Sequence, residues 1–254
     1  ILALNHNAMR RKVEGILGSS QFEFGDLPDT SVVIAAENLR QIPFENVIRA
    51  YMAKTTTATS LYQHYMQGFR DFCGHKLPEE LVANGPLPYV MDTPSTKSDK
   101  HDESISPEVM FNHCVVSYWQ YRQIINASLV AFGMVSEFLN TRGLILVDTK
   151  TEHGINKKGK IVVQDEVYTM DSSRFWLKGD YEEQWTRYMK NGTPIEPKSV
   201  SKEFARGFSR GTEGYTDDQR AQIGVRYVEG IQNLLCIGFE PDMRPWRVMV
   251  RSGI

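Results

Sequence analysis

The stretch that decides the fold runs from Gly143 to Trp176. It reads Gly143-Leu-Ile-Leu-Val-Asp-Thr-Lys-Thr-Glu-His-Gly154, then a polar turn, then Lys160-Ile-Val-Val-Gln-Asp-Glu-Val-Tyr168 and Met170-Asp-Ser-Ser-Arg-Phe-Trp176. The unbroken apolar run 144–147 is typical of a strand buried on both faces. Beyond it, Asp148, Lys150 and Glu152 share one face, because strand side chains repeat every two residues. With residues 156–159, Asn-Lys-Lys-Gly, as its loop, the stretch predicts a β-hairpin with charge at one end.

The register of this hairpin decides whether its charged side chains meet. If Ile155 pairs with Lys160, then Lys150 faces Asp165, and Glu152 becomes a diagonal neighbour of Asp165 with Cβ atoms roughly 7 Å apart. Two carboxylates and a lysine in this arrangement can bind a divalent cation and phosphate oxygens. A slip by one residue sends Asp165 to the opposite face. From spacing alone, a solvated hairpin with an ordinary surface ion pair is an equally good interpretation.

Both halves of the stretch resemble the signature of the phosphoribosylaminoimidazole-succinocarboxamide synthases, the SAICAR synthetase family. In that family the first half usually reads Asp-Thr-Lys-Phe-Glu-Phe-Gly, and the second reads Asp-Glu-Val-Leu-Thr-Pro-Asp-Ser-Ser-Arg-Phe-Trp. This chain departs at Thr151 and His153, where the family prefers aromatic residues, and at Met170, where it prefers proline. The charged positions are retained, so the departures concern local packing more than chemistry.

Two stretches nearer the N-terminus resemble the same family. Residues 42–51, Ile-Pro-Phe-Glu-Asn-Val-Ile-Arg-Ala-Tyr, match its Ile-Pro-Leu-Glu-Val-Ile-Val-Arg-Gly-Tyr, which makes Arg49 the counterpart of a phosphate-binding arginine. An arginine suits that role because its planar fork can meet phosphate oxygens bidentately. Without the resemblance, Arg49 would be interpreted as a solvated strand-end residue. Residues 59–65, Thr-Ser-Leu-Tyr-Gln-His-Tyr, match Gly-Ser-Ala-Trp-Lys-Glu-Tyr and make Ser60 a substrate-binding candidate.

Two further stretches complete the resemblance. Residues 93–97, Thr-Pro-Ser-Thr-Lys, and 101–106, His-Asp-Glu-Ser-Ile-Ser, are polar loops by pattern, and the resemblance implies that Lys97 and Asp102 line the active cleft. Residues 202–206, Lys-Glu-Phe-Ala-Arg, resemble a family segment that ends in an arginine near the active site. Arg206 is therefore a further substrate-binding candidate.

The remaining elements are predicted from caps, stops and apolar periodicity. The predicted helices span 1–20, 107–115, 117–142, 199–208 and 217–236, and the further predicted strands lie within 30–37 and at 46–51, the latter after a break at residues 42–43. Residues 177–197 have no clear period. The tail 240–254 has no assigned role beyond packing or a subunit contact.

The composition of the chain excludes several classes of protein. It has 254 residues, of which 41% are hydrophobic and 24% charged, as in one large globular domain or two small lobes. A net charge of −2 gives no basic field for nucleic acid. No apolar run approaches the ~20 residues of a membrane helix, and no secretory signal is present. Three well-separated cysteines, Cys73, Cys114 and Cys236, predict reduced thiols in a cytoplasmic protein.

The resemblance implies an α+β, two-lobed fold with ATP in the cleft between the lobes. Residues 1–42 would be the remainder of the N-terminal nucleotide-binding lobe, with Glu37 and Asn38 near adenine, and 43–254 the larger substrate-binding and catalytic lobe. The family's Gly-Lys-Val-Arg-Asp type of segment, which closes over the ATP phosphates, is not found in this chain. The N-terminal lobe is therefore expected to be incomplete, and no other phosphate-binding glycine motif replaces that segment.

The resemblance also implies an activity: ATP-dependent ligation of L-aspartate to carboxyaminoimidazole ribonucleotide (CAIR), with ATP and Mg²⁺ required and a homo-oligomer allowed. The roles it implies are Lys150, Lys97 and Asp102 as catalytic residues, Arg49, Ser60, Arg174, Asp171 and Arg206 as substrate-binding residues, and Glu152 and Asp165 as metal ligands. Two alternatives remain open. A kinase-like phosphotransferase would stop at phosphorylation, although the retained set of Arg49, Ser60 and Arg174 argues against it. A non-catalytic nucleotide-binding relative would account for the missing N-terminal segment.

Overall fold

The computed structural model describes residues 1–22, 35–97, 103–208 and 214–238. Its elements, in chain order, are α1 (Leu2–Leu17), β1 (Arg40–Tyr51), α2 (Leu61–Met66), β2 (Asp71–Phe72), β3 (His75–Lys76), β4 (Pro86–Asp92), β5 (Ser95–Thr96), α3 (Pro107–Asn112), α4 (Tyr118–Thr141), β6 (Leu144–Ile155), β7 (Ile161–Gln164), β8 (Ser173–Leu177), α5 (Lys178–Asn191), α6 (Lys202–Arg206) and α7 (Asp217–Leu235).

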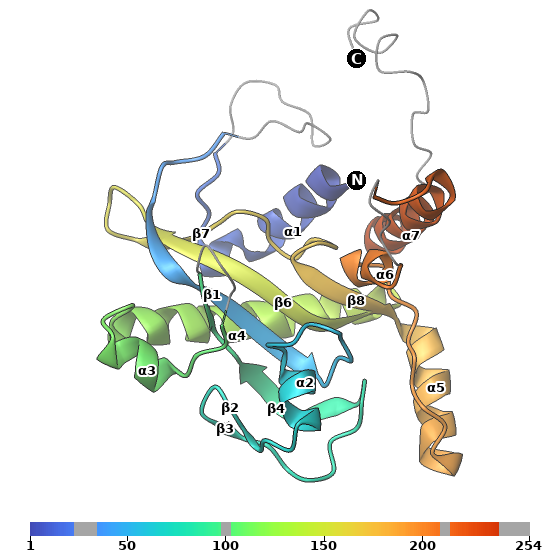
Figure 1. Ribbon diagram of the computed structural model, residues 1–254. Coiled ribbons are helices and arrows are strands. Elements are labelled where there is room, and N and C mark those ends of the chain that lie inside the picture. Colours follow the sequence, from blue (N-terminus) through green and yellow to red (C-terminus); the bar gives the residue numbers. More distant parts are fainter. Residues whose placement is uncertain (23–34, 98–102, 209–213, 239–254) are drawn as a thin grey trace, which may run out of the picture.

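An antiparallel sheet organises the structure (Figure 1). Its strands follow the order β4-β1-β6-β7, with β5 added beside β1 and β8 beside β6. The two longest strands, β1 and β6, lie next to each other, so that Arg49 is opposite Asp148 and Glu45 is opposite Glu152. The predicted strand at 144–147 is therefore confirmed as the start of a strand in the middle of the sheet.

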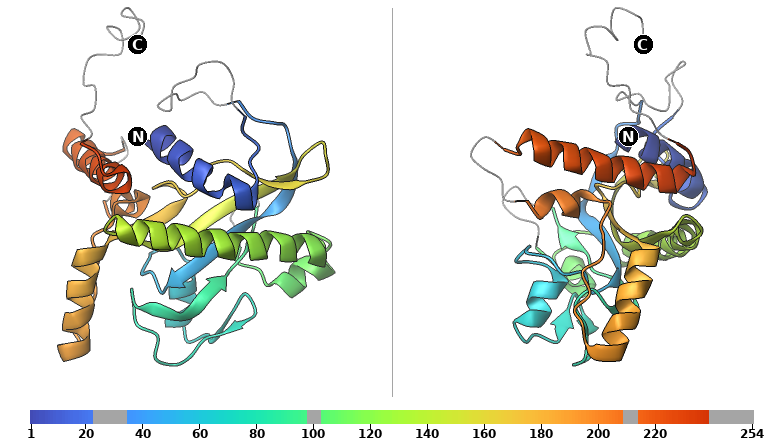
Figure 2. Two further views of the ribbon diagram at one scale, coloured as in Figure 1. Left: turned by 180° about the vertical axis from the view of Figure 1, so that it is seen from behind. Right: turned by 90° about the vertical axis from the view of Figure 1, so that its right-hand side faces the viewer.

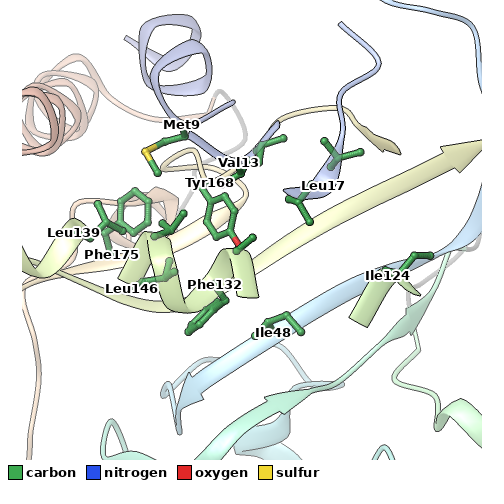
Figure 3. Packing of buried hydrophobic residues seen from close by; sticks show 14 of the residues in the cluster. Met9, Val13, Leu17, Ile48, Ile124, Phe132, Leu139, Leu146, Tyr168 and Phe175 are labelled. Carbon is green, nitrogen blue, oxygen red and sulfur yellow. The ribbon is translucent and has the colours of Figure 1, made fainter. Parts of the chain in front are cut away.

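Helix α4 lies along one face of the sheet, behind it in Figure 1 and in front of it in the left view of Figure 2, with α1 beside it. Buried side chains of α1, α4 and the sheet form the main core between them (Figure 3). Leu144 and Leu146 of β6 belong to this core, whereas Ile145 and Val147 pack with Trp176 on the other side. Cover on both faces explains the unbroken apolar run of the sequence.

A β-bulge in β6 carries the polar residues away from this core. The pairing with β8 shifts between Leu146 and Asp148, and such an extra residue reverses the alternation of the side chains that follow. After the bulge Thr151 accepts a hydrogen bond from Asn46, which also contacts Ser128 of α4. Asp148 and its neighbours in alternation consequently face away from α4.

The predicted helices agree with the structure where local signals are strong. Three helices have side-chain N-caps: α3 is capped by Ser106, α4 by Ser117 and α7 by Thr216. The caps of α4 and α7 are complete capping boxes. Two predictions were wrong. Strand β1 is continuous through residues 42–43, where its pairing with β6 shifts instead of breaking, and α5 occupies a region without clear periodicity. Most of the predicted strand at 30–37 lies outside the described residues.

The predicted hairpin register was also wrong, by one residue. Ile155 pairs with Ile161, so the loop has five residues and Gln164, not Val163, lies opposite Glu152. Asn156 stabilises the longer loop, because its Oδ1 accepts from the backbone N–H groups of Lys158 and Lys160 at 3.0 Å each. Strand β7 then ends before Asp165.

Helix α4 has the length of a membrane-spanning helix. In the described part of the chain it alone is long and apolar enough, by length and composition, to cross a membrane. Its buried face packs on β6, β1 and α1, which is the arrangement of a core helix.

The predicted boundary between the two lobes, at residues 42 and 43, falls inside β1. The three cysteines are free.

Candidate active site

A cavity of about 240 Å³ opens on the face of the sheet opposite α4. Six residues expected to act there line it together: Arg49, Ser60, Lys150, Asp171, Arg174 and Arg206. They come from β1, the start of α2, β6, the turn before β8, β8 itself and α6. The fold thus assembles the cavity from parts of the chain that are far apart in sequence.

Two arginines share one carboxylate in the cavity wall. Arg49 donates from Nη1 to Asp148 Oδ2 at 2.8 Å, and Arg174 Nε lies 3.3 Å from Asp148 Oδ1. Arg49 also donates from Nε to Thr93 Oγ1 at 2.9 Å. Burial lowers the pKa of Arg49, and the charge of Asp148 opposes this fall. Because an arginine in a protein stays protonated, Asp148 pairs with two positive charges, and Glu203 Oε2 lies 4.0 Å from Arg174 Nε.

Arg174 retains an unused donor. Its Nη1 is buried and has no hydrogen-bond partner within the described part of the chain. A buried donor without a partner costs free energy, so such groups are rare in folded proteins unless a ligand completes them. An anionic ligand in the cavity would supply that partner.

Ser60 occupies the N-cap position of α2. Its Oγ accepts from the backbone N–H of Gln63 at 3.2 Å, and its side chain is buried. The hydroxyl hydrogen can still be donated to a ligand, because a serine is a donor as well as an acceptor.

Two lysines and two glutamates form a second charged group, with Glu45 on β1, Lys150 and Glu152 on β6, and Lys97 directly after β5. Lys150 Nζ lies 2.6 Å from Glu45 Oε1 and 3.8 Å from Glu152 Oε1, and Lys97 Nζ donates to Glu152 Oε2. Both glutamates are buried and directly opposite each other in the ladder. Like charges placed in this way repel unless cations neutralise them. The carboxylate beside Glu152 is therefore Glu45, not Asp165 as the predicted register had placed it.

The other predicted residues lie elsewhere. Asp165 is exposed, has a φ of 62°, and does not line the cavity described above. Glu37 and Asn38 line a separate cavity of about 440 Å³ together with Lys157 and Lys158 of the hairpin loop. Asp102 lies outside the described residues. Among residues 1–22, 35–97, 103–208 and 214–238, no three His, Cys, Asp or Glu side chains are grouped for a metal ion.

Sequence reasoning missed several residues of the cavity, notably Glu45, Asp148, Thr93, Lys202 and Glu203. Glu45 and Lys202 stand inside stretches that carry the family resemblance, so a signal for them existed. Burial lowers the pKa of Lys202, and the nearby charge of Arg206 lowers it further. Thr93 also stands in such a stretch, 93–97, but its contact with Arg49 exists only in the fold and could not be predicted from a local pattern.

Comparisons with known proteins agree on one family. A family model described as SAICAR synthetase matches residues 10–222. The phosphoribosylaminoimidazole-succinocarboxamide synthase of Legionella pneumophila (strain Paris) is 36% identical over 228 residues, which are 86% of this chain and 70% of that protein. The chloroplastic enzyme of the same name from Arabidopsis thaliana is 38% identical over 192 residues, and these cover 75% of this chain but only 45% of the plant protein.

Two solved structures share the α+β fold. The SAICAR synthase from Saccharomyces cerevisiae complexed with SAICAR has a TM-score of 0.73 at 22% identity, with 94% of this chain and 82% of that chain covered. A type-2 SAICAR synthetase in complex with ADP has a TM-score of 0.64 at 21% identity, with the same coverage. At these identities the similarity concerns the fold alone, and it confirms the expected fold class.

Proposed function

Because the chain belongs to the SAICAR synthetase family, we propose that it is an ATP-dependent ligase that joins L-aspartate to CAIR and releases SAICAR, ADP and phosphate in purine biosynthesis. Relatives bear the name of that activity, and structures of the same fold are described with SAICAR and with ADP. The observation that carries the proposal is the convergence of Arg49, Ser60 and Arg174 on one cavity. Those groups suit the phosphate of a ribonucleotide.

In the proposed complex the CAIR phosphate lies against Arg174 and Arg49. Arg174 offers its buried, unused Nη1, and Ser60 offers its hydroxyl. Asp148 holds both guanidinium groups before any ligand arrives, so little ordering remains to be done on binding. A phosphate would accept charge-assisted hydrogen bonds, which are stronger than neutral ones, from these guanidinium groups.

The chemistry requires activation of a carboxylate, which is a poor acyl donor. ATP would transfer its terminal phosphoryl group to the CAIR carboxylate and leave as ADP, and the aspartate amine would then attack the acyl carbon and displace phosphate. We assign Lys150 to neutralise charge that develops at the reacting carboxylate, and Lys97 to pair with a carboxylate of the incoming aspartate. Asp102 is assigned to accept the amine proton. Positioning and charge neutralisation provide most of the rate enhancement in this scheme.

Mg²⁺ fits the donor chemistry near the end of β6. Glu152 is a buried carboxylate, and Mg²⁺ in nucleotide sites is usually bound by one or two carboxylates together with phosphate oxygens and water. On the family resemblance alone, we propose Glu152 and Asp165 as its ligands. In this structure Glu45, not Asp165, lies opposite Glu152, and Lys97 occupies the Glu152 carboxylate that the metal would take. Glu37 and Asn38 are proposed to contact adenine, in a cavity where Lys157 and Lys158 add positive charge.

The decisive experiment measures ADP release by the full chain with CAIR, ATP and Mg²⁺, with and without L-aspartate, and identifies the product by mass spectrometry. Aspartate-dependent ADP release with SAICAR formation is expected. ADP release without aspartate would favour a phosphotransferase, and nucleotide binding without turnover would favour a non-catalytic relative. The same proposal places the enzyme in the cytoplasm and allows a homo-oligomer, which fractionation and sedimentation velocity would test.

A further inference from the structure

Helix α7 reaches the candidate active site through one side chain. The hydroxyl group of Tyr227 donates a hydrogen bond to Oδ1 of Asp171, which lines the cavity. The matched part of the family ends at residue 222, so most of α7, including Tyr227, lies beyond it. We propose that Tyr227 is a positioning residue that fixes the carboxylate of Asp171 for the ribonucleotide. The inference rests on the function proposed above.

The state of the Tyr227 hydroxyl suits this role. Burial raises its pKa, and its hydrogen bond to Asp171 raises it further. The hydroxyl therefore stays protonated at any physiological pH and can act only as a donor toward the carboxylate. A hydrogen bond to a charged group is among the stronger ones in a protein.

The turn around Asp171 fixes its backbone but not its carboxylate. The backbone N–H groups of Asp171 and Ser172 donate to Thr169 Oγ1 at 3.2 and 3.0 Å, and Met170 N–H donates to Asn5 Oδ1 at 2.9 Å. These contacts hold the main chain. Among the described residues, the hydrogen bond to the carboxylate comes from Tyr227, while the charge of Lys202 also acts on it without a hydrogen bond.

Close packing of α7 against its neighbours fixes the position of Tyr227. Gly230 lies one helical turn further along α7, and a Cβ there would be 2.5 Å from Met170 Sδ and 3.3 Å from Val200 Cβ. Ile231 and Leu234 of the same helix are buried in the main core. Helix α7 is thus pressed against the residue that precedes Asp171, beside α6 at one end of the molecule (Figures 1 and 2).

This contact also accounts for one departure from the family signature. Met170 stands where the family prefers proline, and its side chain is buried with the sulfur against Gly230. The room for that long side chain exists because α7 has a glycine at the contact. The two positions together set how closely α7 approaches the turn that carries Asp171.

The test compares Tyr227→Phe with Tyr188→Phe, a matched loss of a hydroxyl group on α5, away from the cavity. Tyr227→Phe is expected to raise the KM for CAIR about five- to tenfold, to change kcat by less than about twofold, and to leave the KM for ATP unchanged. Calorimetric titration with CAIR alone should show the same loss of affinity. That measurement does not need turnover, so it separates failure of this inference from failure of the proposed ligase.

A double-mutant cycle supplies the second criterion. In an Asp171→Asn background, Tyr227→Phe should have little further effect on CAIR affinity, because the paired carboxylate is already gone. Any of three results would overturn the proposal. The effects of the two substitutions on CAIR affinity could be additive, the CAIR affinity could be unchanged in Tyr227→Phe, or the affinity for ATP could fall by the same factor.

A second variant covers the case in which Tyr227→Phe folds poorly. Gly230→Ala should weaken CAIR binding, because the added Cβ must displace either α7 or the side chain of Met170, the residue before Asp171. Gly224→Ala, where an added Cβ meets nothing within 4 Å, should not. Thermal unfolding of each variant checks that it is folded. Equal CAIR affinity in these two glycine variants would also refute the positioning role.

Discussion

At the scale of single residues, His153 is a buried polar side chain whose hydrogen-bonding groups are unsatisfied in the described core. Its side chain is buried, and neither ring nitrogen has a hydrogen-bond partner among the described residues. Burial lowers its pKa to about 4. The unfolded chain therefore binds a proton below about pH 6.5 that the folded protein does not bind until about pH 4. Stability is fully present above pH 6.5 and falls as the pH drops through this window.

His153→Phe should remove this dependence on pH. The free energy of unfolding should rise, because two unsatisfied buried nitrogens disappear, and the loss between pH 6.5 and pH 4, up to about 3 kcal/mol in the parent, should shrink. Chemical denaturation at several pH values measures both effects. An exposed histidine, changed in His113→Asn, is the control. A parental pH dependence in His153→Phe would contradict the assignment.

Arg174 provides the sharpest test of the phosphate subsite. Arg174→Ala should weaken CAIR binding by about 1.5–3 kcal/mol, the value of a lost charged hydrogen bond, and leave ATP binding nearly unchanged. Arg174→Lys keeps the charge but not the planar fork, so an intermediate loss is expected. Isothermal titration with each ligand measures this, with Arg187→Ala on the exposed side of α5 as control. Equal losses for both ligands would reject the role.

At the scale of elements, the hairpin between β6 and β7 depends on Asn156. Its side chain accepts from two backbone N–H groups of the loop, which sets the five-residue length and hence the register. Asn156→Ala should lower the free energy of unfolding by about 1 kcal/mol. Thermal unfolding, with exposed Lys157→Ala as control, measures it. If both variants unfold alike, the loop is not held by this side chain.

The hairpin also shows what the sequence can and cannot predict. Alternation correctly grouped Asp148, Lys150 and Glu152 on one face, because it is a local property of any strand. It gave no warning of the bulge after Leu146, which decides that this face points away from α4. Nor could it choose between a four- and a five-residue loop. Helix ends at Ser117 and Thr216 were predictable because capping is local.

At the scale of the whole molecule, two of the charged residues near Glu152, Glu45 and Lys97, come from distant parts of the chain. The sequence suggested Asp165 as its neighbour, whereas the fold places Glu45 there, 107 positions earlier in the chain. Such pairs are predictable only from family resemblance, because no local pattern links β1 with β6. Arg49, Ser60 and Arg174 were grouped correctly by that resemblance alone.

The metal proposal has a test at this scale. Glu152→Gln and Asp165→Asn should each raise the Mg²⁺ concentration required for half-maximal turnover, because each change removes one negative charge from the proposed ligands. Circular dichroism should show an unchanged fold. Glu45→Gln is the comparison, since Glu45 lies opposite Glu152 and contacts Lys150 but is not a proposed ligand. A parental Mg²⁺ requirement in Asp165→Asn would remove that residue from the metal site.

The pairing of β1 with β6 also has a consequence for when the cavity forms during folding. Arg49 meets Asp148 across 99 positions of the chain, and a contact of such sequence separation forms only after a large loop has closed. Domains rich in these contacts fold slowly. We therefore expect the cavity to form late in folding. A ribonucleotide that binds only the completed cavity would slow unfolding and draw the folding equilibrium toward the native state.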